Sequence, residues 1–181
     1  MNKSQIRKKI LKIRKKNFNK NFKINSDKSI SFLKTNTSNF KNIGGYYPSN
    51  YEIDDLEILE LLKKKKFNVS LPIIKKDNQM NFFKWSNNEP LKINKFGIPE
   101  PVSSRIFYPD ILLIPLVAFD SNLNRLGYGE GFYDRYIQKI EKIKKIIKIG
   151  LAFSFQRTSS IPINQYDKRL DFIIRSEERR V

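Results

Sequence analysis

The stretch from Asp110 to Lys145 places a buried strand, a glycine-rich loop and an amphipathic helix one after another. Residues 111–117 form a nearly continuous apolar run, a pattern that predicts a strand buried on both faces, as in a parallel sheet. Three glycines at alternate positions follow within residues 127–131, and residues 132–145 then carry apolar side chains at helical spacing. This order of elements predicts an α/β fold, a mostly parallel sheet flanked by helices.

The remaining chain extends this pattern. Further elements are expected as strands at residues 69–74, 81–84, 146–153 and 172–174, and as helices at residues 3–16 and 56–66. Asp54 and Asp55 precede the second of these helices and lysines end it, as the helix dipole favours. Two prolines predict a loop at residues 98–101. Residues 17–37 are too polar for the pattern to decide their structure.

Length and composition narrow the class of protein. With 181 residues and 39% hydrophobic content, the chain can bury one core, so a single domain over residues 1–181 is expected. No apolar run approaches the roughly 20 residues of a membrane span, and no signal peptide is recognisable, so no membrane association and a cytoplasmic location are expected. The chain has no cysteine and no histidine, which leaves carboxylates, tyrosines, lysines, arginines and a hard cation such as Mg²⁺ for chemistry.

The formal net charge of +18 suggests nucleic-acid binding, because basic proteins gain affinity by releasing counterions from phosphates. Lysine, asparagine and isoleucine are frequent along the whole chain, however, including residues 17–23, so the charge is interpreted as a compositional bias. We therefore expect no specific nucleic-acid partner, and we expect a monomer.

The glycine loop has the features of an anion site. A loop that leaves a buried strand and opens a helix presents free backbone N–H groups and the positive end of the helix dipole. Arg125 and Arg135 flank the loop with guanidinium groups suited to phosphate oxygens, and Asp134 supplies a carboxylate for a cation. Two structural alternatives remain open: the glycines serve only a tight turn, or Asp134 only caps the helix or pairs with Arg135.

Residues 125–135, with the sequence RLGYGEGFYDR, resemble the nucleotide motif of the 5-formyltetrahydrofolate cyclo-ligases, also called methenyltetrahydrofolate synthetases. The resemblance covers nearly the whole chain in the same order. Other matching segments are Lys3 to Arg7 with Arg14, Tyr47-Pro48 with Glu52 to Asp54, residues 97–101, residues 115–120, residues 150–153 with Gln156, Ile161-Pro162, and Asp167 with Leu170-Asp171.

This resemblance implies a fold similar to the phosphosugar-isomerase and CoA-transferase group. It also implies a reaction that converts 5-formyltetrahydrofolate and ATP, with Mg²⁺, into 5,10-methenyltetrahydrofolate, ADP and phosphate. In that reaction the formyl oxygen attacks the γ-phosphoryl group and a neighbouring folate nitrogen closes the ring. Such chemistry depends on positioning and charge stabilisation, so it needs neither cysteine nor histidine.

The resemblance also assigns residues. The ATP contacts it implies are Lys3, Arg7, Arg125, Leu126, Gly127, Tyr128, Gly129, Glu130, Gly131, Phe132 and Tyr133, with Arg135 in support. The folate contacts are Tyr47, Glu52, Trp85, Tyr128, Gly129, Gly131 and Phe132. The carboxylates expected to hold Mg²⁺ are Asp134 and Asp167.

Each assignment has a structural alternative. Lys3 and Arg7 lie four apart on one helix face, which is also the pattern of a solvated basic face. Glu52 stands near a helix start, where an acid is favourable without any ligand, and Trp85 is of a type that usually packs in a core.

Glu130 departs from the family pattern, because glycine or lysine usually stands at that position. This departure keeps open a folate-binding relative with weakened catalysis. The charge keeps open, as a more distant alternative, a basic RNA-associated protein.

Overall fold

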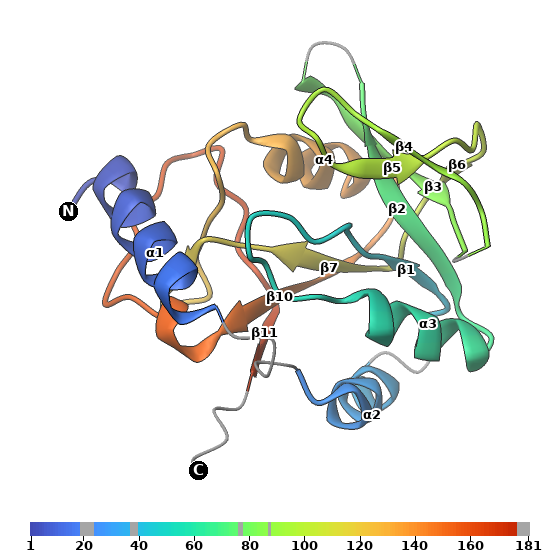
Figure 1. Cartoon of the computed structure of the whole chain (residues 1–181), viewed down its shortest axis with the longest axis horizontal. Helices are drawn as coiled ribbons and strands as arrows, with labels where there is room; N and C mark the ends of the chain where they lie inside the picture. The colour runs from blue at the N-terminus through green and yellow to red at the C-terminus, as the bar shows by residue number, and fades with distance from the viewer. Residues whose placement is uncertain (19–23, 37–39, 76–77, 87, 177–181) are drawn as a thin grey trace.

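The computed structural model describes residues 1–18, 24–36, 40–75, 78–86 and 88–176 and has a mixed α/β fold (Figure 1). Its main sheet has the strand order β11-β10-β7-β1-β2-β3-β6. The strands are β1 (Asn42–Gly44), β2 (Asn68–Ile74), β3 (Met80–Lys84), β6 (Ile106–Phe107), β7 (Ile111–Pro115), β10 (Ile147–Phe153) and β11 (Phe172–Ser176). The five strands from β11 to β2 pair in parallel, and β3 and β6 add antiparallel pairs at one edge. The predicted fold class, a mostly parallel sheet flanked by helices, is confirmed.

Strand β7 lies at the centre of the parallel sheet because both of its faces are apolar. Ile111 pairs with Ile43 of β1 on one side and with Ile147 of β10 on the other. Alternate residues of β7 then point to opposite faces, with Leu113 in one core cluster and Leu112 in another.

The helices cover the two faces of the sheet. Helices α2 (Ser26–Asn36) and α3 (Leu56–Lys64) pack on the face that carries Leu113, and helix α4 (Phe132–Ile140) packs on the face that carries Leu112 (Figure 1). Helix α1 (Lys3–Asn17) lies at the side and packs on the short hairpin β8 (Ala118–Phe119) and β9 (Arg125–Leu126). Within the described residues, no helix has the length and apolar character needed to cross a membrane.

The loop predicted for residues 98–101 was wrong. Strand β5 (Pro99–Pro101) pairs with β4 (Leu91–Ile93) in a separate two-stranded hairpin. Pro99 and Pro101 both fall on positions whose N–H would point away from the partner, while Glu100 between them pairs with Lys92. The two prolines therefore remove no hydrogen bond between β4 and β5.

Two other expectations needed adjustment. Residues 17–37, which the sequence left undecided, include α2, whose buried residues Ile30 and Leu33 contribute to the core. The helix predicted for residues 132–145 ends at Ile140, and Ile143 is exposed. The chain has to turn after Ile140 because Ile147 already pairs with β7. A short 3₁₀ turn, Ser154–Gln156, follows β10.

Candidate functional site

A cavity of about 1200 Å³ lies at the carboxyl ends of β1, β2 and β7, the edge at which open α/β sheets bind ligands. Tyr46 lines it just after β1, and Ile74 and Pro115, the last residues of β2 and β7, line it as well. The other walls come from the glycine loop, the start of α1, the β4–β5 hairpin and a loop that includes Asp167. Single-ligand pockets commonly have about 300–1000 Å³, so this cavity has room for two small molecules.

The glycine loop connects β9 to α4 along one wall of the cavity. Gly129 has a φ of 118°, and Gly131, which caps α4, has a φ of 68°, both in the region that favours glycine. A Cβ at Gly131 would lie 2.8 Å from Nη1 of Arg135. The loop therefore depends on glycine, and it opens the N-terminus of α4 toward the cavity.

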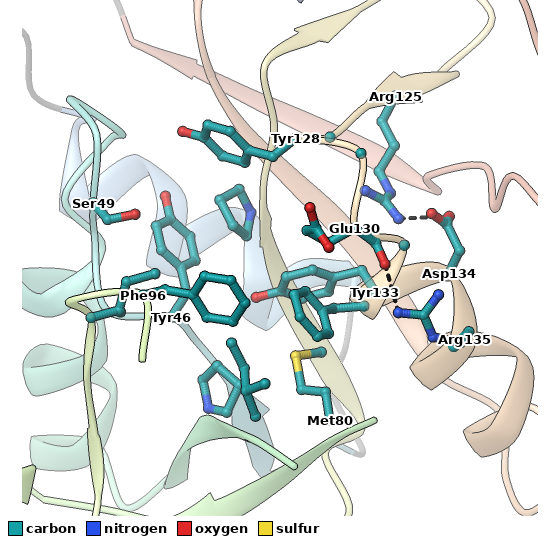
Figure 2. A pocket seen from close by; sticks show the side chains of 18 of the residues that line it. Tyr46, Ser49, Met80, Phe96, Arg125, Tyr128, Glu130, Tyr133, Asp134 and Arg135 are labelled. Carbon is teal, nitrogen blue, oxygen red and sulfur yellow. Dashed lines mark hydrogen bonds and ion pairs between the residues drawn. The ribbon is translucent and has the colours of Figure 1, made fainter. Parts of the chain in front are cut away.

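Cationic side chains from two distant parts of the chain surround this loop. Arg7 of α1 donates from Nε to the carbonyl of Gly127 at 2.8 Å. Arg135 donates to the carbonyl of Glu130 at 2.6 Å, and Arg125 donates to Asp134 at 2.6 Å (Figure 2). Three guanidinium groups therefore lie around the loop near the N-terminus of α4, and each is hydrogen-bonded to a protein oxygen.

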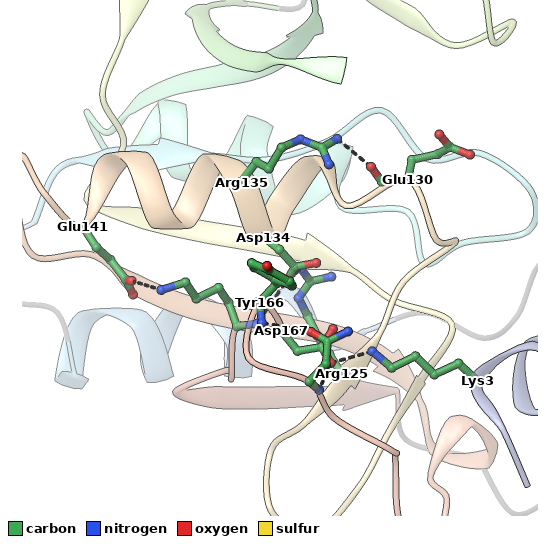
Figure 3. A network of polar contacts seen from close by, with 10 residues as sticks. Lys3, Arg125, Glu130, Asp134, Arg135, Glu141, Tyr166 and Asp167 are labelled. Carbon is green, nitrogen blue, oxygen red and sulfur yellow. Dashed lines mark hydrogen bonds and ion pairs between the residues drawn. The ribbon is translucent and has the colours of Figure 1, made fainter. Parts of the chain in front are cut away.

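The two predicted metal carboxylates lie close together at the same end of the cavity. Asp134 accepts the backbone N–H of Lys168 at 3.0 Å, next in sequence to Asp167, and Asp167 pairs with Lys3 at 2.5 Å (Figure 3). One oxygen of each, Oδ2 of Asp134 and Oδ1 of Asp167, accepts no hydrogen bond within the described ranges.

This donor set fits Mg²⁺ in its usual protein environment. No cluster of three or more histidine, cysteine or acidic side chains occurs among the residues that the structure covers. Mg²⁺ usually binds through one or two carboxylates and completes its shell with water and substrate phosphates. Asp134 and Asp167 provide that number of hard oxygen ligands beside the glycine loop.

A second group of residues lines the opposite wall. Tyr47 is half-buried, and Glu52 is buried and accepts the backbone N–H of Ser49 at 2.9 Å. Burial raises the pKa of Glu52, while hydrogen bonds from Ser49 and the nearby charge of Arg14 oppose that rise.

Tyr133 lines the cavity with its ring, and its hydroxyl is buried beneath the cavity wall. This hydroxyl has no partner within the described part of the chain, and burial raises its pKa. The hydroxyl thus stays protonated.

The structure brings nearly all of the sequence-predicted site residues to this one cavity. Those that line it are Lys3, Arg7, Tyr47, Glu52, every residue from Arg125 to Arg135, and Asp167. Trp85 is the exception, since it packs in the core cluster beneath α3 and does not line the cavity.

Sequence reasoning missed Phe96 and Asn94. They lie at the tip of the β4–β5 hairpin, where Phe96 contacts Phe132 edge to face, with ring centroids 5.9 Å apart. An exposed aromatic residue directly before Gly97 was the available signal.

Comparisons with known proteins agree with this geometry. A model of the 5-formyltetrahydrofolate cyclo-ligase family matches residues 1–176. The chain is 37% identical over 134 residues to a 5-formyltetrahydrofolate cyclo-ligase of Haemophilus influenzae, covering 70% of this chain and 71% of that protein. It is 35% identical over 153 residues to the enzyme of the same name from Mycoplasma genitalium, covering 84% and 81%. A solved structure of Aquifex aeolicus 5,10-methenyltetrahydrofolate synthetase matches with a TM-score of 0.77 and 30% identity, over 98% of this chain and 91% of that one.

Proposed function

The chain belongs to the 5-formyltetrahydrofolate cyclo-ligase family, and from that membership we propose that it converts 5-formyltetrahydrofolate and ATP to 5,10-methenyltetrahydrofolate, ADP and phosphate. The observation that carries this proposal is the single cavity in which the arginine-flanked glycine loop faces Tyr47 and Glu52. A cavity of about 1200 Å³ with a phosphate-binding wall and a separate aromatic and acidic wall suits a nucleotide and a folate bound side by side.

The nucleotide half is the wall formed by the glycine loop and α1. Backbone N–H groups of the loop and the N-terminus of α4 would hold the triphosphate, with Arg7 and Arg125 as charged donors. Lys3 reaches the same end of the cavity through its contact with Asp167. These groups would stabilise the charge that spreads over the transferred phosphoryl oxygens.

Asp134 and Asp167 are the residues that would hold Mg²⁺. When bound, the cation would neutralise phosphate oxygens that otherwise repel an incoming nucleophile. In the structure Arg125 pairs with Asp134 and Lys3 pairs with Asp167. When a nucleotide and the cation bind, the two carboxylates would hold the cation, and Arg125 and Lys3 would bind phosphate oxygens instead.

The folate half is formed by residues 46–52 and the tip of the β4–β5 hairpin. Glu52 would accept hydrogen bonds from donors on the pterin, and Tyr47 would contact its ring. The chemistry then needs only alignment. The formyl oxygen attacks the γ-phosphorus and ADP leaves. The neighbouring folate nitrogen next attacks the activated carbon, and the phosphate departs with the formyl oxygen while that nitrogen loses its proton.

The absence of histidine and cysteine is compatible with this sequence of steps, because no protein atom becomes covalently bound. Catalysis would then come mainly from placing two bound substrates in contact, which is worth several kcal/mol in general, about 7–11 at its upper range.

The test is direct. Purified protein is mixed with 5-formyltetrahydrofolate, ATP and Mg²⁺, and the absorbance of the methenyl product is followed. We expect turnover in the wild type, a loss of at least about 100-fold in Asp134→Asn, and wild-type turnover in Asp27→Asn, a matched change at an exposed position of helix α2. Absence of product with a correctly folded wild-type protein would refute the proposed reaction.

A further inference from the structure

Helix α1 carries a third basic residue on the face that holds Lys3 and Arg7. Arg14 lies two helical turns after Arg7, and its side chain is only 1% exposed. It does not line the cavity, so it is not placed to contact a substrate. A buried guanidinium is costly unless it is paired and hydrogen-bonded, so its partners indicate what it does.

Arg14 has two partners in the described residues, one structural and one in the site. Its Nη1 donates to the carbonyl of Leu116 at 3.3 Å, just past the end of β7. Its Nη2 donates to the hydroxyl of Tyr128, and its guanidinium lies 5.5 Å from the centroid of the same ring. Arg14 therefore fixes the tip and the ring of the side chain at the centre of the glycine loop.

Tyr128 connects this contact to the other half of the cavity. Figure 2 shows its ring extending from the glycine loop toward the segment that carries Ser49. The carboxylate of Glu52 accepts from Ser49, and the nearness of Tyr128 and the positive charge of Arg14 both lower the pKa of this carboxyl against the effect of burial. Arg14 and Glu52 are both buried, and each interacts with Tyr128, which is 38% exposed at the cavity. Tyr128 thus connects α1 to residues 46–52.

The same end of α1 contacts this segment a second time. Phe18, the residue after the end of α1, packs on Tyr51 with ring centroids 5.0 Å apart. Asn50 and Tyr51 both have positive φ, 52° and 62°, a conformation that costs free energy for residues other than glycine. A turn of this kind keeps its shape only when its neighbours hold it, and α1 is one of those neighbours.

We propose that Arg14 is a positioning residue for folate: through Tyr128 it holds Glu52 in the orientation that receives the pterin, although it touches neither substrate. The inference rests on the proposed function, since it assigns Glu52 to the folate. It also makes α1 a link between the two halves of the site. Arg7 anchors the nucleotide loop independently, through the carbonyl of Gly127.

The experiment compares dissociation constants for 5-formyltetrahydrofolate and for a non-hydrolysable ATP analogue with Mg²⁺, both by calorimetry. In Arg14→Met the folate constant should rise at least tenfold, about 1.4 kcal/mol, while the nucleotide constant stays within threefold. Arg14→Lys keeps a charged donor for the Tyr128 hydroxyl and should recover most of the folate affinity. Lys12→Met, an exposed charge removal on the same helix, should change neither constant.

Tyr128→Phe provides an independent variant should Arg14→Met fold poorly. It should weaken folate binding by a similar factor, and adding Arg14→Met to it should weaken folate binding little further, because both changes break one chain of contacts. Unchanged folate affinity in Tyr128→Phe, or an equal loss of both ligands in Arg14→Met, would overturn the inference. Wild-type protein that binds no folate would refute the proposed function as well, whereas a folate-converting wild type with an unaffected Arg14→Met would refute only this inference.

Discussion

Arg125 donates a 2.6 Å hydrogen bond to Asp134 and so joins the two ends of the glycine loop. The guanidinium side chain is 5% exposed and the carboxylate side chain 23%, so the pair is only partly screened by water. The same oxygen of Asp134 accepts the backbone N–H of Lys168. This contact connects the loop near residue 167 to the glycine loop, and it places both predicted metal carboxylates beside the proposed phosphate site.

Replacing Asp167 should show whether this second carboxylate holds the cation. Asp167→Asn removes one negative ligand, so we expect the Mg²⁺ concentration for half-maximal turnover to rise at least about tenfold, with partial recovery at high Mg²⁺. Asp171→Asn, four residues further along, should leave the Mg²⁺ dependence unchanged. A wild-type Mg²⁺ titration curve for Asp167→Asn would exclude Asp167 as a ligand.

Glu130 should weaken nucleotide binding rather than catalysis. Its side chain is exposed on the cavity rim, where solvent screens its repulsion of a triphosphate, so the cost is expected to be below about 1 kcal/mol. Glu130→Gln should therefore lower the KM for ATP about two- to fivefold and leave kcat unchanged. A large rise in kcat in Glu130→Gly would instead support a relative whose catalysis is weakened by this carboxylate.

Gly131→Ala should lower the stability of the fold at the glycine loop. Alanine at a φ of 68° costs roughly 1–2 kcal/mol, and its Cβ would also press on Nη1 of Arg135. Gly97→Ala is the control that measures backbone strain alone, because Gly97 has a φ of 75° and an added Cβ would contact no other atom there. In thermal denaturation Gly131→Ala should lose more stability than Gly97→Ala, and equal losses would show that the contact with Arg135 has no cost.

The sequence predicted those parts of the molecule that depend on local patterns. The apolar run of β7, the helical spacing of α1 and α3, and the glycine loop before α4 were all visible, because burial on both faces and helical periodicity leave a direct trace in the sequence. The resemblance then indicated the site, and the structure brings all but one of the residues it named to one cavity.

Features that depend on distant partners were not predictable in this way. Arg14 looks like one more cation of a solvated helix face, and only the carbonyl of Leu116 and the hydroxyl of Tyr128, more than 100 residues away, bury it. Trp85 is of a type that can stack on a ligand, yet it directly follows the end of β3 and packs in the core. The β4–β5 hairpin was not predicted, because the sequence does not show on which side of a strand a proline nitrogen points. A proline that faces away from the partner strand is therefore indistinguishable in the sequence from one that breaks the pairing.

Asp55 should make the stability of the protein depend on pH. It is fully buried; Oδ2 accepts the backbone N–H of Tyr46 at 3.1 Å, and Oδ1 has no partner in the described chain. Burial raises its pKa well above the ordinary value. The folded state thus binds this proton more tightly than the unfolded state. Protonated Asp55 therefore stabilises the fold fully at a pH below the pKa of this carboxyl in the unfolded chain, about 3.9. The stabilisation is lost as the pH rises through the pKa of the same carboxyl in the folded protein.

Asp55→Asn removes this titration while retaining an acceptor for Tyr46. Urea denaturation between pH 5 and pH 8 should show that the variant becomes more stable relative to the wild type as the pH rises. The difference in the free energy of unfolding should grow by about 1.4 kcal/mol per pH unit, as long as the pH is below the pKa of Asp55 in the folded protein. Asp54→Asn, at the exposed neighbouring position, should show no such gain. If the free energies of unfolding of Asp55→Asn and wild type run parallel over this range, Asp55 is ionised in the folded protein throughout it, and its unpaired oxygen must be solvated.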